Sequence, residues 1–373
     1  MKDFEYTTIT DTDILIKSLN YATKDIDIKD LVFLDIETTG FSPKNSVCYL
    51  IGTAYITGNQ LICRQAFSDT PDDEADMLNS FISSINANSI IITYNGSNFD
   101  IPFIEARCMR HDICTDAISQ CRQIDIYSHI RKLSRLLKLD NLKQKTVEKF
   151  CGINREDIYS GGELIETYKD YIIKYKLNDN DAASALDKLL THNREDVMSL
   201  PLICPVLMYN SLLHIVECDN LQISDIIIDN SAVSYTLNSP MCYPGRLSLN
   251  HNGINLCVSD DTITCMIPVI NDMLKHFYAD YRNYYYLPAE DRAIHKSIAA
   301  YVDGSSKEKA SKDNCYTKKA GYFIPYYDET KYPAFRYEYN DKSFFIQYDE
   351  ELLNNKDFIK PYIQDIINSM TDN

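Results

Sequence analysis

The most constraining feature of the sequence is an apolar run that ends in two carboxylates. Leu31–Ile36 (LVFLDI) is apolar up to Asp35, which is typical of a central strand buried on both faces. Alternate residues of a strand point to the same side, so Asp35 and Glu37 would project together. A solvated turn or a helix cap is the alternative, but an uncompensated charge beside a buried strand is costly. The pair therefore predicts a divalent metal site, and oxygen ligands suit Mg²⁺ or Mn²⁺.

Two later stretches carry further acids. In ITYNGSNFDIPFI, Asp100 follows a second apolar strand and opens a predicted helix, where its alternative role is an N-terminal cap. In THNREDVMSL, His192 and Asp196 are four residues apart, so on a helix they share one face. The alternative for this pair is a solvated helix face. The three stretches together are more specific than any one of them.

The order and spacing of these stretches resemble the DEDD (DnaQ-like) superfamily of 3′→5′ exonucleases on the ribonuclease H-like fold. The three motifs are Asp35-x-Glu37, Asn95-x-x-x-Phe99-Asp100 and His192-x-x-x-Asp196. The sequence pattern LDIETTG…YLIG…TYNG-x-x-FD-x-P…HN-x-x-DV is similar to that of the YprB-type ribonuclease H-like family. The resemblance covers about residues 30–212, and the rest of the chain resembles no family.

The resemblance implies a mixed sheet, with three antiparallel strands followed by parallel ones and helices on both sides. The strand pattern agrees, since CYLIGTAYIT and QLICRQAF flank Gly58-Asn59, a hairpin signal. We expect an N-terminal extension at residues 1–29, a ribonuclease H-like domain at residues 30–215 and a C-terminal α+β domain at residues 216–373. The fold of the C-terminal domain is unrecognised, and the domain is a candidate substrate clamp. We expect helices in it near Pro268–Tyr281 and Lys356–Met370.

The resemblance also implies roles for the motif residues. The four carboxylates would bind two divalent ions, Mg²⁺ or Mn²⁺, in a two-metal hydrolysis of the terminal phosphodiester: Asp35, Glu37, Asp100 and Asp196. His192 would be the general base, for which its ordinary pKa is suited. Here the chain departs from the family, which has either H-x-x-x-x-D or Y-x-x-x-D, because His192 stands at the tyrosine spacing. Glu195 is a rival candidate for the base.

Residues beside the acids give weaker predictions of substrate contact. Thr38 and Gly40 follow the first motif; Gly40 suggests a turn, and Thr38 could contact the terminal nucleotide. Asn95 would bond to the substrate or tie its own loop. Phe99 would stack on a base or belong to the core. Asp125, in QIDIY, resembles a further acid of the superfamily, although an Asp before a helix is ordinarily a cap.

The net charge of −17 argues against a nucleic-acid binder unless basic residues are grouped locally. Two stretches meet that condition: residues 129–149, with seven lysines and arginines, and residues 295–319, where lysines alternate with tyrosines. Basic and aromatic residues together suit single strands. The alternatives are an exposed helix face for the first stretch and a Lys/Ser loop for the second.

Cellular location and cofactor class follow from what the sequence lacks. No apolar stretch approaches the ~18 residues of a membrane span, and the N-terminus MKDFEYTTITDTD has no apolar signal segment. Twelve cysteines are irregularly spaced with no C-x-x-C pair, which argues against a zinc ribbon. We therefore expect a cytoplasmic protein with no membrane partner.

These observations together predict a divalent-metal-dependent 3′→5′ exonuclease acting on nucleic acid, with single strands favoured. The alternative is a catalytically silent nucleic-acid-binding or scaffold module on the same fold. The presence of all four acids favours the enzyme. No motif distinguishes DNA from RNA, because that choice rests on contacts to the 2′-hydroxyl.

Overall fold

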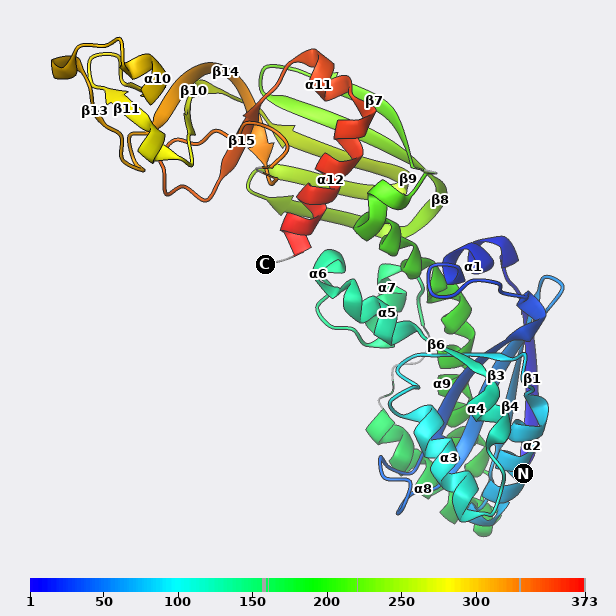
Figure 1. The fold of residues 1–373 in the computed structure, drawn as a ribbon. Helices are drawn as coiled ribbons and strands as arrows, with labels where there is room; N and C mark the ends of the chain where they lie inside the picture. The colour runs from blue at the N-terminus through cyan, green and yellow to red at the C-terminus, as the bar shows by residue number, and fades with distance from the viewer. Residues whose placement is uncertain (156–158, 160, 220, 329, 372–373) are drawn as a thin grey trace. The chain divides into compact units, whose positions relative to one another are not determined.

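The computed structural model describes residues 1–371 apart from 156–158, 160, 220 and 329 (Figure 1). The chain divides into two compact units. The N-terminal unit comprises Met1–Asn210 with Tyr243–Gly245, and the C-terminal unit comprises Ser211–Cys242 with Arg246–Asn373. The composition shift had placed this boundary after residue 215.

A six-stranded mixed sheet forms the centre of the N-terminal unit, in the order β1-β4-β3-β2-β5-β6. Its strands are β1 (Lys2–Ile9), β2 (Leu31–Thr38), β3 (Cys48–Thr57), β4 (Gln60–Phe67), β5 (Ile90–Thr93) and β6 (Arg122–Asp125). Strands β1, β4, β3 and β2 pair antiparallel, whereas β5 and β6 run parallel to β2. The mixed sheet predicted from the strand order is therefore confirmed.

Two of the antiparallel strand pairs test predictions made from the sequence: the β3–β4 hairpin is confirmed, and the separate N-terminal extension is corrected. β3 and β4 form the hairpin around Gly58-Asn59, where Gly58 has a φ of +63°. Residues 1–29, set apart above as an extension, instead supply β1, which pairs with β4 along its whole length. KDFEYTTI is mostly polar and has no fully buried position, so this edge strand lacks the apolar run that marks a central strand.

Helices cover both faces of the sheet (Figure 1). Neighbouring residues of β3 divide between the faces, because side chains alternate along a strand. Ile51 packs with α2 (Glu74–Ser84) and α3 (Asp100–Arg110). Leu50 packs with α8 (Gly161–Lys176) and α9 (Ala182–Ile203). The shorter helices are α1 (Thr12–Leu19), η1 (Ile28–Asp30), η2 (Pro71–Asp73), α4 (Asp116–Gln120), α5 (Ile126–Lys132), α6 (Ser134–Leu137) and α7 (Gln144–Phe150).

One helical stretch among the described residues, Ala182–Glu217, is long and apolar enough to cross a membrane by length and composition, which corrects the statement above that no such apolar stretch occurs. It comprises α9 and η3 (Cys204–Glu217), and about two-thirds of its most apolar window is buried inside the protein. α9 packs against β2, β3 and β4. It is the core helix of the N-terminal unit.

Three small sheets make up most of the C-terminal unit. Their strands are β7 (Gln222–Ile228), β8 (Ala232–His251) and β9 (Ile254–Pro268) in the first, β10 (Ile270–Phe277), β14 (Tyr316–Tyr326) and β15 (Phe344–Gln347) in the second, and β11 (Tyr284–Leu287), β12 (Arg292–His295) and β13 (Glu308–Lys309) in the third. The helices are α10 (Lys296–Ala299), η4 (Tyr281–Asn283), η5 (Gly304–Ser306), α11 (Glu350–Asn354) and α12 (Lys356–Thr371). The predicted α+β class is confirmed.

The prediction of a helix near Pro268–Tyr281 was wrong. This segment is the strand β10, which pairs with β14 over eight residues, from Ile270 opposite Phe323 to Phe277 opposite Tyr316. Leu274 is its one fully buried residue among the described positions of the strand. Pairing with a strand about 45 positions away in the sequence decided the conformation, and no local pattern could reveal it.

A buried charge cluster ties the loop that follows β2 to the helices behind it. Glu74 accepts from the Cys48 backbone N–H at 2.7 Å and from Arg107 Nε at 2.8 Å. His111 Nε2 lies 2.8 Å from the same carboxylate, and Arg107 also donates to the Pro43 carbonyl at 2.8 Å. The side chains of Glu74 and Arg107 are 1% and 5% exposed. This cluster fixes the loop that contains Gly40.

Removing one member of this pair should destabilise the fold strongly. We expect Arg107→Met to lower the free energy of unfolding by about 3–5 kcal/mol, because it leaves the Glu74 carboxylate buried and uncompensated. The matched control is Arg64→Met, since Arg64 pairs with Glu5 at 2.8 Å but both are more than half exposed; that change should cost less than about 1 kcal/mol. Urea denaturation of both variants measures the difference, and equal costs would contradict the assignment.

Candidate active site

The strand β2 brings the first two acids to the face of the sheet that α9 covers. Asp35 and Glu37 lie within β2, opposite Gly52 and Leu50 of β3. The Asp35 carboxylate accepts from Asn193 Nδ2 at 2.9 Å, and the same amide donates to the Asp35 carbonyl at 3.2 Å. The acids are therefore part of the strand, held from across the interface by α9.

Asp100 approaches β2 from the first turn of α3. Its Oδ1 accepts a hydrogen bond from the backbone N–H of Ile36 at 3.1 Å. Because Ile36 stands between Asp35 and Glu37 in the sequence, the Asp100 carboxylate lies beside this part of β2. The side chain is 5% exposed. Burial raises the pKa of Asp100 to about 7, and the charges of Asp125 and Asp196 add to the shift.

The third motif comes from the middle of α9. His192 Nε2 lies 3.0 Å from Asp196 Oδ2 and 3.4 Å from Glu37 Oε1. One donor atom from each of these three residues lies within 4.8 Å of the others. The tightest donor group therefore includes His192, with Asp35 and Asp100 beside it, whereas the family resemblance implied four carboxylates alone. Glu195 is not a member of this group.

The electrostatics of the cluster fit a divalent cation. Burial raises the pKa of Asp35 well above its usual range, and the charges of Asp196, Asp100 and Glu37 raise it further. Burial also opposes the ionisation of Asp196, but His192 and Arg155 outweigh burial and lower its pKa. Buried carboxylates that repel one another are stabilised by a cation among them. The carboxylate oxygens of the cluster are donors of the kind that suits Mg²⁺ or Mn²⁺.

Arg155 supports Asp196 from outside this group, and sequence reasoning missed it. Its guanidinium pairs with one oxygen of Asp196 and with both oxygens of Glu148, whose side chain is 1% exposed. Gln144 Nε2 donates to the Asp196 carbonyl at 2.8 Å and to Ser199 Oγ at 2.9 Å. Because Arg155 and Glu148 belong to no recognisable pattern, only the fold brings them to the site.

The loop of the second motif is held by Asp125. Asn95 has a φ of +65°, and its backbone N–H donates to Asp125 Oδ1 at 2.7 Å. The same oxygen accepts from the Tyr127 N–H at 3.1 Å and so caps α5. The Asn95 side chain accepts from Asn98 Nδ2 at 3.0 Å. Asp125 has the capping contact that the sequence suggested, and it also positions the loop before Asp100.

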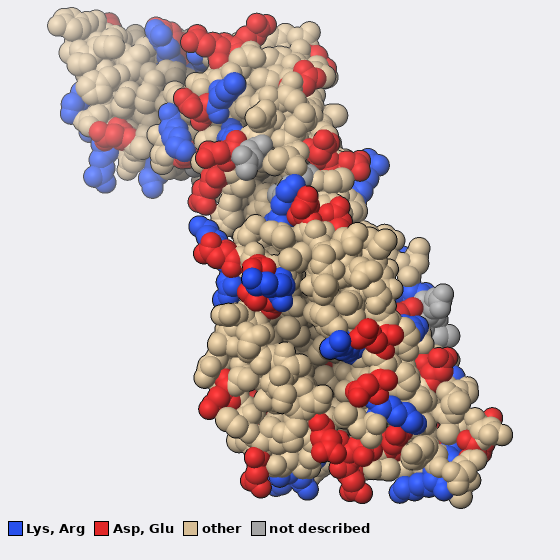
Figure 2. All heavy atoms as spheres, turned by 90° about the vertical axis from the view of Figure 1, so that its right-hand side faces the viewer, with Lys and Arg blue, Asp and Glu red and all other residues tan. Residues whose placement is uncertain are grey.

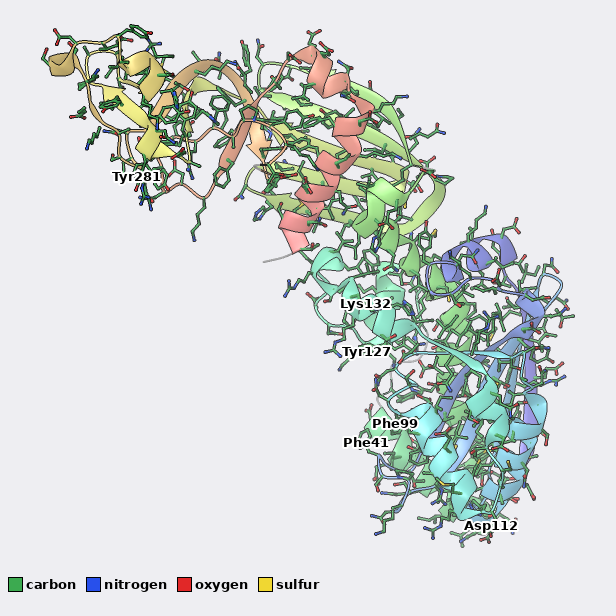
Figure 3. The ribbon with its side chains drawn as sticks, viewed as in Figure 1. Phe41, Phe99, Asp112, Tyr127, Lys132 and Tyr281 are labelled. Carbon is green, nitrogen blue, oxygen red and sulfur yellow. The ribbon has the colours of Figure 1, made fainter. Side chains whose placement is uncertain are left out.

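The predicted substrate residues after the first motif have structural contacts of their own. Thr38 Oγ1 donates to the Gly40 carbonyl at 3.0 Å. A Cβ at Gly40 would lie 2.8 Å from Ser46 Oγ, so close approach explains this glycine. Phe99 is partly buried against the core, in agreement with its alternative role. Phe41 was missed: it is 88% exposed, and its ring meets Phe99 edge-on at 6.1 Å (Figure 3).

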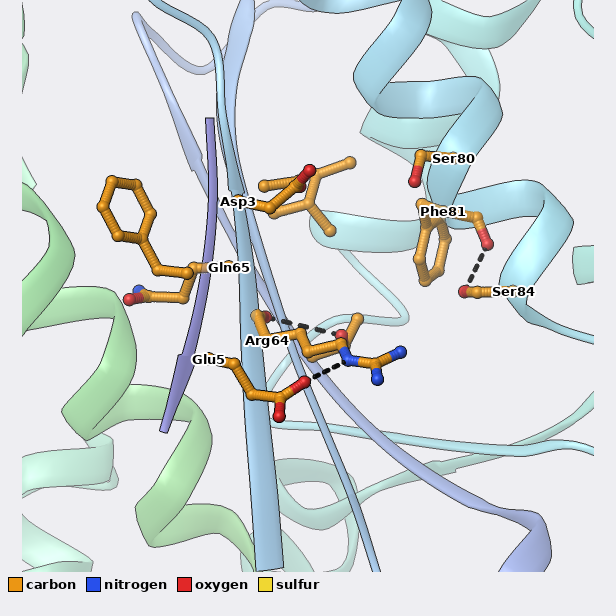
Figure 4. Close-up of a pocket in the computed structure, with 11 residues that line it drawn as sticks. Asp3, Glu5, Arg64, Gln65, Ser80, Phe81 and Ser84 are labelled. Atoms are coloured by element: carbon orange, nitrogen blue, oxygen red, sulfur yellow. Dashed lines mark hydrogen bonds and ion pairs between the residues drawn. The ribbon is translucent and has the colours of Figure 1, made fainter. Parts of the chain in front are cut away.

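A separate cavity of about 390 Å³ lies between α2 and the sheet (Figure 4). It is lined by Asp3, Glu5 and Arg64 among others, and none of the four motif carboxylates borders it. Its ion pair, Arg64 with Glu5, is exposed and self-satisfied. This cavity therefore adds no group to the acid cluster of β2, α3 and α9.

The N-terminal unit is similar in sequence to known proteins. Residues 32–208 match the sequence model RNase_H_2, described as RNase_H superfamily. This segment has the ribonuclease H-like fold, and it contains all nine predicted site residues. It is similar to YprB of Bacillus subtilis (strain 168), an uncharacterized protein, with 30% identity over 176 residues. These cover 46% of this chain and 40% of YprB, so the chain spans less than half of that relative.

Two solved structures overlap the fold in part. A family B DNA polymerase from the hyperthermophilic archaeon Pyrobaculum calidifontis is 12% identical, covering 68% of this chain and 35% of the polymerase, with a TM-score of 0.36. E. coli exonuclease I in complex with a dA16 oligonucleotide is also 12% identical, covering 61% and 54%, with a TM-score of 0.28. Both TM-scores are low.

Gly52 explains how α9 comes close enough to hold Asp35. A Cβ at this position would clash with the Asn193 amide oxygen and lie 2.7 Å from Val197 Cγ2. Gln65 Nε2 fixes that same amide oxygen at 2.8 Å. Glycine inside a strand often marks a close backbone approach, which is the signal that YLIG carries in the sequence.

We therefore expect Gly52→Ala to push α9 away from β2 and to lower the free energy of unfolding by about 1–3 kcal/mol through overpacking. Because Asn193 would move with α9, Asp35 would lose its amide partner and metal binding would weaken. Chemical denaturation and calorimetric titration with Mn²⁺ measure the two effects. Gly162→Ala, where a Cβ meets nothing within 4 Å, is the control; unchanged stability of Gly52→Ala would contradict the prediction.

The raised pKa of Asp100 predicts a pH dependence of stability. A carboxyl whose pKa is higher in the folded protein than in the unfolded chain stabilises the fold at low pH and loses that contribution as pH rises. Without metal, stability should therefore fall between about pH 4 and the folded pKa of about 7. Urea denaturation in EDTA at several pH values should show this fall in the wild type and a smaller one in Asp100→Asn. Identical pH profiles would contradict it.

Proposed function

We propose that this protein is a divalent-metal-dependent 3′→5′ exonuclease that hydrolyses the terminal phosphodiester of a single-stranded nucleic acid. The observation that carries the proposal is the convergence of four carboxylates and one imidazole from β2, α3 and α9, in which burial and mutual repulsion raise the pKa of Asp35 and Asp100. Such a cluster is costly to the fold unless it serves to bind cations.

Glu37 and Asp196 would hold one ion, and Asp35 and Asp100 would complete the site for a second. The imidazole of His192, beside Glu37 and Asp196, would not ligate an ion, which leaves its Nε2 able to accept a proton. The four carboxylates would hold two Mg²⁺ or Mn²⁺ ions, whose chemistry would be to activate a water and to stabilise the charge on the leaving 3′-oxygen. Asn193 keeps the Asp35 carboxylate turned toward the cluster. The chain's own residues thus orient the acids before any substrate arrives.

His192 is the proposed proton acceptor. Its Nε2 faces both Glu37 and Asp196, so it lies at the acid cluster where the attacking water would sit. A positioned imidazole can take a proton at neutral pH. The spacing His192-x-x-x-Asp196 puts this imidazole one helical turn before the acid, the place that tyrosine has in one subgroup of the family it resembles.

Contacts to the terminal nucleotide would come from the loops on either side of the cluster. Phe41 offers an exposed ring on which a base can stack, and Phe99 supports it from behind. The Asn95 side chain and the backbone around Gly40 are polar groups of these loops that would contact the nucleotide. Since Thr38 donates to Gly40, its role is to shape that loop.

One observation favours the alternative, a catalytically silent nucleic-acid-binding module. Arg155 already neutralises Asp196 in the protein alone, so the cluster is partly compensated without any ion. In that case Arg155 would take the place of a metal. We further propose a cytoplasmic location, since all twelve cysteines are free thiols, as a reducing compartment allows.

A cleavage assay decides between the two. Wild type, Asp35→Asn and Asp196→Asn are incubated with 5′-labelled DNA and RNA strands in Mg²⁺, Mn²⁺ or EDTA. We expect a ladder that shortens from the 3′ end, that needs metal and that both substitutions abolish, because each removes a ligand charge.

The matched control is Asp187→Asn, which removes an exposed acid from the same helix and should leave the rate unchanged. Wild-type rates in Asp35→Asn would refute the site. Binding without cleavage in any metal would establish the silent module instead.

A further inference from the structure

A group of cations lies next to the acid cluster in this otherwise acidic chain. Between Ile126 and Phe150 the sequence has seven lysines and arginines and only two acids, Asp140 and Glu148, whereas the whole chain carries −17. The seven are Arg131, Lys132, Arg135, Lys138, Lys143, Lys145 and Lys149, all exposed, and they are called the basic surface here. Glu148 is buried, so it does not offset the charge at the surface.

Several of these cations are available to a partner. Arg131, Lys132, Lys138 and Lys149 make no ion pair with any residue that the structure describes. The leucines of the same segment point inward: Leu133, Leu136 and Leu137 are at most 4% exposed. The segment therefore buries its apolar side and presents its positive side to solvent.

Both ends of this segment are attached to the acid cluster. At its start, Asp125 caps α5 and holds the loop of Asn95, five residues before Asp100. In α7, Gln144 donates to the Asp196 carbonyl at 2.8 Å. Because α5 to α7 are tethered to the second motif on one side and to the third motif on the other, the basic surface borders the site.

Aromatic side chains lie along the same side of the N-terminal unit. Figure 3 shows Lys132, Tyr127, Phe99 and Phe41 one after another on that side. Tyr127 is partly exposed and meets Tyr94 edge-on at 5.9 Å. Figure 2 faces another side, where acidic and basic side chains are intermingled. Cations followed by exposed rings suit a strand whose phosphates pair and whose bases are free to stack.

The second basic stretch, residues 295–319, is less suited to this role. Lys318 pairs with Asp291, and Lys307 donates to the Val302 carbonyl at 2.7 Å. Lys296 donates to the Asn283 side chain. About half of the lysines in this stretch thus serve the C-terminal unit itself.

We propose that the basic surface is the phosphate-binding track along which a single-stranded nucleic acid reaches the acid cluster, with its 3′ end toward Phe41. This proposal rests on the proposed function and describes how the substrate would reach that active site. Affinity comes from phosphate neutralisation, so it is strongly salt-dependent and independent of base sequence.

The test compares two sets of four neutralised cations in an Asp35→Asn background with EDTA, so that no strand is cut. The first set is Arg131→Gln, Lys132→Gln, Lys138→Gln and Lys149→Gln. The control set is Lys309→Gln, Lys312→Gln, Lys319→Gln and Lys342→Gln, which lie in the C-terminal unit and change the net charge equally. Fluorescence anisotropy of a labelled single strand gives Kd over a range of salt, and thermal melts check that each variant folds.

We expect the first set to raise Kd at least about tenfold and to reduce the slope of log K against log salt by up to about 3, since each lost phosphate contact removes about 0.7. The control set should bind as the parent does. Equal losses in both sets, or a loss in the control set alone, would overturn the proposal.

Two further measurements distinguish the track from a membrane-binding surface and from the nuclease activity itself. Vesicles containing phosphatidylserine are the second probe: vesicle binding lost in the first set, with unchanged strand binding, would overturn the track in favour of a membrane surface. Cleavage is measured separately without the Asp35→Asn change. If the wild type cleaves nothing but the first set loses binding, the nuclease proposal fails and the track stands; if cleavage is found and binding is unchanged, only the track fails.

Discussion

Four carboxylates that lie close together and are largely shielded from water are the constraint on which the N-terminal unit depends. Each ionised acid at such a place loses its hydration and repels the others, so the fold must supply compensation. It does so with the imidazole of His192, the amide of Asn193 and the guanidinium of Arg155, all from outside β2. These partners cover part of the charge, and the raised pKa of Asp35 shows that compensation in the protein alone is incomplete.

The residues around the cluster hold it in shape before any ligand binds. Gln65 fixes Asn193, Glu148 fixes Arg155, and Asp125 fixes the loop of Asn95. Every one of these supports is itself buried and hydrogen-bonded, which limits how far the acids can separate under their own repulsion. In metal sites the ligands are usually oriented by such outer hydrogen-bond partners. Here these partners also oppose the repulsion that would otherwise push the carboxylates apart.

The overall acidity of the chain and a nucleic-acid substrate are compatible because charge acts locally. At physiological salt an exposed charge is screened beyond about 8 Å, so a strand on the basic surface is little affected by acids on other faces. The helices α5 to α7 concentrate cations where they border the cluster, whereas about half of the lysines in residues 295–319 are engaged in contacts of the C-terminal unit itself.

The sequence by itself determined the mixed sheet, the β3–β4 hairpin and the choice of the acid-bearing motifs, because apolar runs, turn residues and spacing are local properties of the chain. The tertiary structure alone decided that β1 joins the sheet and that residues 270–277 form a strand, since each pairs with a distant partner. It alone also brought Arg155 to Asp196. Long-range pairing and burial depend on residues far apart in sequence, so no local pattern can encode them.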